Sequence, residues 1–162
     1  MDRINRIIKN ELYLKYIEKI KCHEKDRKFC RHDVTHFLDV CRLAEIDWLN
    51  QCCSIKGVTR EFIYAAGLLH DIGRWQEYEE GISHEVASGD FAPEILKECG
   101  FLEEEIEIIV EAIVNHRNSN VMEQKSLAGI LYRADKKSRP CFLCDVEKEC
   151  NWSFAKKNLE IR

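Results

Sequence analysis

Apolar residues recur at helical spacing in nearly every segment of this 162-residue chain, and this spacing constrains the fold more than any other feature. Side chains three, four and seven residues apart share one face of a helix, so the pattern predicts amphipathic helices around a common core. The chain has only 7 Gly and 2 Pro, too few for the turns of a many-stranded sheet protein. No repeat or low-complexity tract divides it. We therefore expect an all-α fold, a single-domain helical bundle over residues 1–162.

Six helices are expected from the apolar stripes and from the residues that can cap them. They are expected from Ile4 to Ile20, from near Asp33 to Leu49, after Thr59 to Leu69, from near Ser83 to Gly100, from Ile106 to near His116, and from Leu127 to Ala134. Pro93 is expected to kink or restart the fourth helix, because proline lacks the backbone donor that a helix interior uses.

Charge and hydropathy exclude two classes of partner. The chain has 25 basic and 29 acidic residues, a net charge of -4, which is too acidic for stable nucleic-acid binding through counterion release. No apolar run approaches the roughly 18 residues of a membrane span, and no apolar signal core follows Met1. We expect a cytoplasmic protein without a membrane partner, and leave a homodimer open. The nine Cys, an odd number that includes Cys52-Cys53, are then expected to be reduced thiols or metal ligands.

Several polar side chains lie on helix faces that are expected to be buried. His70 follows Ile63 by seven residues and Ala66 by four, so it projects from their face. The same relation to apolar neighbours holds for His36, His116 and Asp135. Burying imidazoles and carboxylates without partners would cost several kcal/mol. Divalent transition metal ions, which imidazole nitrogen and carboxylate oxygen both bind, are the simplest shared partner.

The order His36, His70-Asp71, His84, His116, Asp135 resembles the HD-domain superfamily of metal-dependent phosphohydrolases, in particular its members with six ligands and two metals. The resemblance spans roughly residues 30 to 140 and includes the string Gly67-Leu68-Leu69-His70-Asp71-Ile72-Gly73-Arg74. It implies one ion held by His36, His70, Asp71 and Asp135, and a second held by His84 and His116, with Asp71 bridging. Family members often carry Arg at the position of Asp39, so the chain departs from the family at one place where a phosphate contact could lie.

The resemblance also implies a mechanism. Two ions roughly 3.5 to 4 Å apart lower the pKa of a bridging water toward about 7, and the resulting hydroxide attacks phosphorus. Asp71, Arg74 and Lys136 are the expected catalytic residues, and Arg139 is a further candidate for phosphate binding. Fe, Mn, Ni, Co and Zn are not distinguished by this donor set.

A small nucleotide is the expected substrate. The six-ligand set is similar to that of the symmetrical dinucleoside tetraphosphate hydrolases of the superfamily, so a dinucleoside polyphosphate is favoured. The sequence lacks the Gly-Tyr-Pro signature of the cyclic dinucleotide phosphodiesterases. Two alternatives stay open: a mixed-valent di-iron oxygenase, which some six-ligand relatives are, and a non-catalytic nucleotide sensor.

Three features are placed outside the main site. His32 precedes its helix and is kept out of the ligand set, and Asp145 has no apolar stripe leading to it. The Cys-rich C-terminal segment, residues 141–162, is expected to pack on the bundle. Its Cys141, Cys144 and Cys150 have spacings that a zinc or iron–sulfur site could use. A fourth ligand would have to come from Cys22, Cys30 or elsewhere, so reduced thiols packing with Trp152 are favoured.

Overall fold

The regular structure is entirely helical. The computed structural model describes residues 1–51, 55 and 57–161, and no β-strand occurs among them, which confirms the all-α prediction. Within these ranges no helix has both the length and the apolar character needed to cross a membrane. The elements are α1 (Asp2–Ile7), α2 (Glu11–His23), α3 (Val34–Asn50), α4 (Arg60–Leu69), α5 (Arg74–Glu80), α6 (His84–Glu98), α7 (Glu103–Asn115), η1 (Ser119–Val121), α8 (Leu127–Lys137), η2 (Cys141–Leu143), η3 (Glu147–Glu149) and η4 (Phe154–Lys156).

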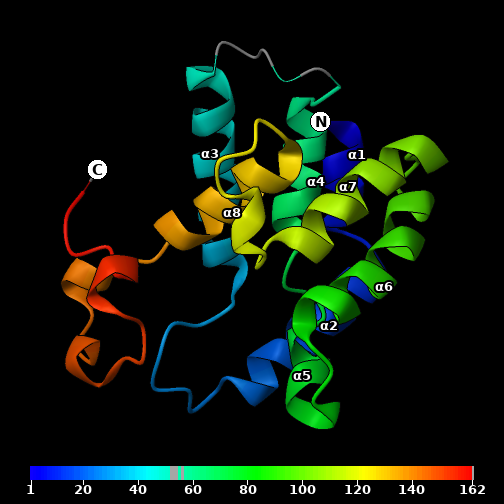
Figure 1. Cartoon of the computed structure of the whole chain (residues 1–162). Coiled ribbons are helices and arrows are strands. Elements are labelled where there is room, and N and C mark those ends of the chain that lie inside the picture. Colours follow the sequence, from blue (N-terminus) through cyan, green and yellow to red (C-terminus); the bar gives the residue numbers. More distant parts are fainter. Residues whose placement is uncertain (52–54, 56, 162) are drawn as a thin grey trace.

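Helix α4 is the centre of the core. It contacts α1, α3, α6, α7 and α8, which surround it in Figure 1. Its side chains Ile63, Ala66, Leu68 and Leu69 are all fully buried. Burying one large apolar side chain contributes about 1.5–3 kcal/mol, so the position of this helix is strongly fixed. The residues that follow Leu69 are therefore attached to a firmly packed helix.

Two glycines on either side of the His70-Asp71 pair allow neighbouring helices to approach closely. A Cβ atom on Gly67 would lie 2.5 Å from the sulfur of Cys41 on α3. A Cβ on Gly73 would lie 2.4 Å from the backbone nitrogen of Ser88 on α6. Such distances are far shorter than van der Waals contact, so only glycine permits this packing. The close approach brings α3 and α6 up to the pair.

Several predicted helix boundaries are wrong. The first predicted helix is two helices, because Asn10 caps a new start by accepting a hydrogen bond from the Tyr13 backbone N–H at 3.1 Å. Pro93 does not restart the helix but lies inside α6, where Ala92 and Ile95, both fully buried, hold the helix on either side of it. The last helix continues from Ala134 to Lys137.

Helix α5 was not predicted. It is seven residues long and buries only Trp75, so no apolar period marks it in the sequence. The capping roles expected of Asp33 and Thr59 are both confirmed by hydrogen bonds to the backbones of His36 and Phe62. The pair Cys52-Cys53 lies outside the described residues.

The C-terminal segment forms short 3-10 turns beyond the end of α8, drawn in orange to red in Figure 1. Asn158 connects it to the bundle, because its side-chain amide donates hydrogen bonds to the carbonyls of Lys136 at 2.7 Å and Arg139 at 3.0 Å. The last carbonyls of a helix have no partner within the helix, so the bond to Lys136 satisfies one of them at the end of α8. The segment is thereby held beside Asp135.

Candidate functional site

The six candidate metal ligands all lie at helix ends. His36 is in the first turn of α3, His84 is the first residue of α6, and Asp135 lies in the last turn of α8. His70 and His116 directly follow α4 and α7, and Asp71 follows His70. All six are buried, with 0–7% of each residue exposed. The structure therefore brings together every ligand that was predicted from the sequence.

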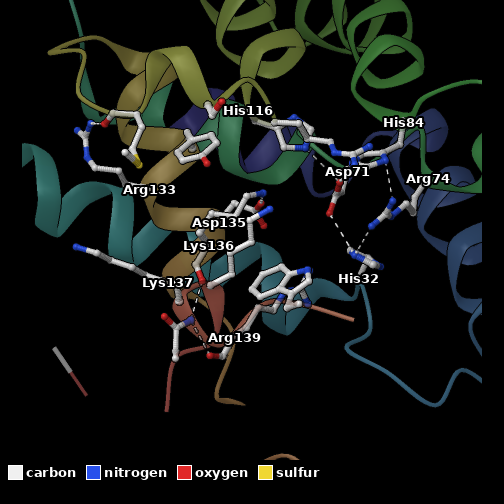
Figure 2. A pocket seen from close by; sticks show the side chains of 18 of the residues that line it. His32, Asp71, Arg74, His84, His116, Arg133, Asp135, Lys136, Lys137 and Arg139 are labelled. Atoms are coloured by element: carbon white, nitrogen blue, oxygen red, sulfur yellow. Dashed lines mark hydrogen bonds and ion pairs between the residues drawn. The ribbon is translucent and has the colours of Figure 1, made fainter. Parts of the chain in front are cut away.

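Asp71 lies between two groups of histidines, of which Figure 2 shows the group of His84 and His116. Its Oδ2 atom is 3.2 Å from Nε2 of His70 and 3.6 Å from Nε2 of His36. Its Oδ1 atom is 3.2 Å from Nε2 of His84 and 3.6 Å from Nε2 of His116. One carboxylate thus presents a different oxygen to each pair of imidazoles, which is the geometry of a bridging ligand.

Asp135 belongs to the first of these groups. Its Oδ1 atom lies 3.4 Å from Nε2 of His36 and 3.8 Å from Nε2 of His70. Its other oxygen pairs with Nζ of Lys136 at 2.6 Å. Asp135 can therefore donate one oxygen to an ion shared with His36, His70 and Asp71.

Hydrogen bonds at Nδ1 direct the histidines. Nδ1 of His70 donates to the Gly67 carbonyl at 2.8 Å, and Nδ1 of His116 donates to the Ile113 carbonyl at 2.6 Å. In a neutral imidazole, a proton on Nδ1 leaves a lone pair on Nε2. In both residues Nε2 is the atom that faces Asp71. These carbonyls therefore select the tautomer that can bind a metal.

The buried atoms at the centre fit a cation. Nε2 of His70 and Oδ1 of Asp71 are buried and make no hydrogen bond with any described residue. Unpaired buried polar atoms are costly, so a positive ion between them would satisfy both. Two sets have ligand atoms within 4.8 Å of one another: His36, His70 and Asp71, and Asp71, His84 and His116. Imidazole and carboxylate donors suit divalent transition ions.

The site keeps its carboxylates ionised. Burial alone raises the pKa of Asp71, but the surrounding histidines outweigh it, and the pKa lies well below the usual range. The same balance holds for Asp135, where His36 and Lys136 lower the pKa against burial. Burial, reinforced by Arg74, lowers the pKa of His84 to about 4. Anionic carboxylates and neutral imidazole are the protonation states that bind metals.

The three predicted cationic residues line the same cavity as the cluster. Arg74 donates from Nη2 to Nε2 of His32 at 2.8 Å, and its Nη1 lies 2.7 Å from Nδ1 of His84. Arg139 is 7% exposed and donates from Nη2 to Nε2 of His36 at 3.0 Å. Lys136 pairs with Asp135. Their positions agree with a phosphate-binding role, which stays a prediction.

A buried network around His32 was missed. Glu24 accepts hydrogen bonds from the backbone N–H of His32 at 2.6 Å, from its Nδ1 at 2.5 Å and from the Tyr78 hydroxyl at 2.6 Å. The opposite nitrogen of His32 faces Arg74 and lies 3.9 Å from Asp71 Oδ2. His32 is in neither group of ligand atoms, but it lines the cavity. The position of His32, four residues before His36, was the feature of the sequence that could have indicated this network.

The cavity beside the cluster has a volume of about 770 Å³, within the range of ligand sites. Cationic residues dominate its wall, whereas acidic residues are represented by Asp71, Glu123 and Asp135. Two parts of the wall were not predicted: four residues before α8, which are Arg117, Ser119, Met122 and Glu123, and four of the C-terminal segment, which are Trp152, Ala155, Lys156 and Asn158. The cationic lining residues are Arg74, Arg117, Arg133, Lys136, Lys137, Arg139 and Lys156.

The excluded residues lie away from the cluster. The Asp39 side chain is 44% exposed and pairs with Arg42 at 3.4 Å, and Asp145 is exposed and lines no part of the cavity. The cysteines among the described residues are free thiols. Burial raises the pKa of Cys30, and Cys141 and Cys144 are close enough to raise it further. Cys30 is thus the cysteine that the fold brings near the C-terminal thiols, and a metal site there stays untested.

Comparison with known proteins agrees with this geometry. An uncharacterized protein of Clostridium beijerinckii is 44% identical over 161 residues, which are 99% of both chains. The crystal structure of a predicted HD superfamily hydrolase from an uncultured Thermotogales bacterium has the same fold, with a TM-score of 0.64. That structure is 23% identical, and the likeness covers 92% of this chain and 80% of the other. The HD domain model matches residues 33–139, which include all six candidate ligands, and the chain therefore belongs to the HD-domain family.

Proposed function

We propose that this protein is a metal-dependent phosphohydrolase that cleaves a phosphoester or phosphoanhydride bond in a small nucleotide, with a dinucleoside polyphosphate favoured. The observation that carries the proposal is the position of Asp71. Its Oδ1 and Oδ2 each lie 3.2 Å from a histidine of a different group. One carboxylate shared by two ligand groups is the arrangement that a pair of divalent ions requires.

The residues of the two groups have separate tasks. One ion would be held by His36, His70 and Asp135. The other would be held by His84 and His116, and Asp71 would bind both ions. When bound, the ions would supply a water of lowered pKa as nucleophile and would neutralise charge on the phosphoryl oxygens. Arg74 and Lys136 lie in the same cavity and would bind the remaining phosphate oxygens.

The lining of the cavity favours a polyphosphate nucleotide. Cationic side chains outnumber acidic ones around it, and the aromatic residues Tyr132 and Trp152 also line it. Cationic groups bind phosphate, whereas aromatic rings bind bases by stacking. A ligand with several phosphates and a base at one or both ends would use both kinds of side chain.

A phosphate-release screen tests the proposal. Purified protein stripped of metal is supplied with Mn, Fe, Co, Ni or Zn and offered diadenosine tetraphosphate, nucleoside triphosphates and nucleoside monophosphates. We expect turnover that depends on metal and requires two ions per chain by elemental analysis. The matched control is Asp39→Asn, which should leave turnover unchanged, because Asp39 lies on α3 outside the cavity and pairs with Arg42.

Two outcomes would contradict the proposal. Oxygen consumption with an iron-loaded protein and without phosphate release would indicate the oxygenase alternative. Stoichiometric nucleotide binding without turnover under any of the metals would indicate a sensor.

A further inference from the structure

The cavity is completed by residues that lie outside the region shared with the family. The HD domain model matches residues 33–139, whereas Trp152, Ala155, Lys156 and Asn158 come from the C-terminal segment. These residues line the same cavity as Asp71 and Asp135. What this part of the wall binds is therefore a property of this chain and does not follow from its family.

The segment is anchored next to the metal-ligand candidates. Asn158, itself a lining residue, donates to the carbonyl of Lys136, which directly follows Asp135 in the last turn of α8, and to that of Arg139, just beyond the helix. The backbone N–H of Phe142 donates to the carbonyl of Asn158 at 3.0 Å and closes the segment into a loop. Trp152 is thus carried by a loop whose two ends are tied to the end of α8.

Trp152 has a ring face without a described partner. Trp75, in contrast, stacks on Tyr16 at 5.8 Å and on Phe91 at 5.5 Å between ring centroids, and Lys19 lies over its ring. Trp152 is half-buried, lines the cavity, and makes no ring or cation contact with any described residue. A large aromatic ring open to a ligand cavity is suited to stack on a planar group.

Two lysines of the cavity wall also have no ion-pair partner within the part of the chain that the structure describes. Arg117 and Arg133 form ion pairs with Glu85 and Asp47, and Lys136 pairs with Asp135. Lys137 and Lys156 form no ion pair with the described residues, although both line the cavity. An ammonium group without a protein partner is free to bind an anionic group of the ligand.

We propose that residues 141–161 form a nucleotide subsite of this cavity, in which Trp152 stacks on a purine base and Lys156 binds the phosphate chain. The proposal deepens the proposed function, since it names how a substrate of the same site is recognised. It requires one ligand with a planar base and several phosphates, so a base-free polyphosphate should bind without help from Trp152.

Binding measurements without turnover test the subsite. Metal-free protein is titrated calorimetrically with diadenosine tetraphosphate and with inorganic tripolyphosphate, using the wild type, Trp152→Ala, Trp152→Phe and Phe154→Ala. We expect Trp152→Ala to weaken the nucleotide Kd about tenfold, as removal of one base-stacking ring does. Trp152→Phe should restore most of the affinity, and tripolyphosphate should bind all four proteins equally. Phe154 is 81% exposed in the same segment and lines no part of the cavity, so its variant is the matched control.

Lys156→Gln separates the phosphate contact from the base contact. It should weaken the nucleotide and tripolyphosphate alike, because its ammonium group contacts what the two ligands share. The subsite is overturned if the wild type binds the nucleotide no tighter than tripolyphosphate, or if Trp152→Ala and Phe154→Ala behave identically. Nucleotide binding that depends on Trp152 but leads to no hydrolysis with any metal would retain the subsite and overturn the phosphohydrolase.

Discussion

In α4 the side chains that face neighbouring helices are fully buried, whereas in the C-terminal segment Leu143 is 77% exposed and Phe154 is 81% exposed. Helix α4 is held by apolar packing, whereas the segment is tied to the bundle by polar contacts of Asn158 with Lys136 and of Glu149 with Lys28. The candidate metal ligands lie at the ends of the packed helices, whereas Trp152 lies in the C-terminal segment. Chemistry that requires exact positions is thus placed on rigid helices, and ligand recognition on a connection that can vary.

The largest effect is expected at the centre of the rigid part. Asp71→Asn keeps the shape of the side chain but removes the charge that both ion sites share. Losing a group that only supports a metal ligand costs about 10- to 100-fold in affinity or activity, so losing the bridging ligand should cost more than about 100-fold. Metal content by elemental analysis and phosphate release should fall together.

Circular dichroism controls for unfolding of this variant. His70→Ala should likewise lose metal and activity with its helix content largely intact, because the apolar face of α4 is unchanged. A collapse of helicity in both variants would mean that these residues support the fold and not a metal site.

A smaller effect is expected from substituting Glu24. This residue lies outside the cavity and influences the site through its hydrogen bonds with His32. Glu24→Gln removes the anion that receives two N–H groups of His32, and His32 in turn contacts Arg74. We expect kcat/KM to fall about 10- to 100-fold, as for other groups that orient a site. Glu79→Gln is the matched control, since Glu79 accepts from His23 at 3.0 Å in an exposed pair. Equal activities of the two variants would contradict a positioning role for Glu24.

The hydrogen bonds of Glu24 also make this network sensitive to acid. The hydrogen bonds of His32 and Tyr78 outweigh burial and lower the pKa of Glu24 to about 2. Because its pKa in the unfolded chain is about 4.3, the stabilisation is complete above that value and is lost as the pH falls toward 2. Urea unfolding of the wild type and Glu24→Gln between pH 5 and about pH 2.5 should therefore show the difference in stability shrinking with acid.

The sequence predicted the convergence of the candidate ligands better than the lining of the cavity, and the reason is periodicity. His36, His70 and His116 occupy positions that apolar stripes mark as buried, so their convergence follows from helix geometry. Trp152 and Asn158 lie in irregular stretches on either side of η4, which have no period, and the place of the segment beside α8 depends on long-range hydrogen bonds. The contact between Glu24 and His32 was not predicted for the same reason, since the loop between α2 and α3 has no stripe.

The contact that joins the two regions is itself testable. Asn158→Ala removes two hydrogen bonds to the end of α8 and should lower the free energy of unfolding by about 1–2 kcal/mol. Proteolysis between residues 141 and 157 should become faster, and KM should rise more than kcat falls. Asn151→Ala, an exposed residue of the same segment without a described hydrogen bond, is the control. Unchanged proteolysis in Asn158→Ala would show that other contacts hold the segment.

The smallest effect concerns the reactivity of cysteine thiols, which is expected to differ between the helical core and the C-terminal segment. Cys41 on α3 is fully buried, and burial raises its pKa to about 12, whereas Cys144 and Cys150 are half-buried in the segment. Only the thiolate reacts with iodoacetamide, so at pH 8 about one Cys41 in ten thousand is reactive even before access is considered. Mass spectrometry should find Cys144 and Cys150 labelled in the native protein and Cys41 labelled only at the rate of unfolding. Raising the pH to 9 should not change this order of labelling, because that pH is still far below the pKa of Cys41. Rapid native labelling of Cys41 would mean that α3 and α4 separate readily, and the proposed contrast between a rigid core and a loosely held wall would then be wrong.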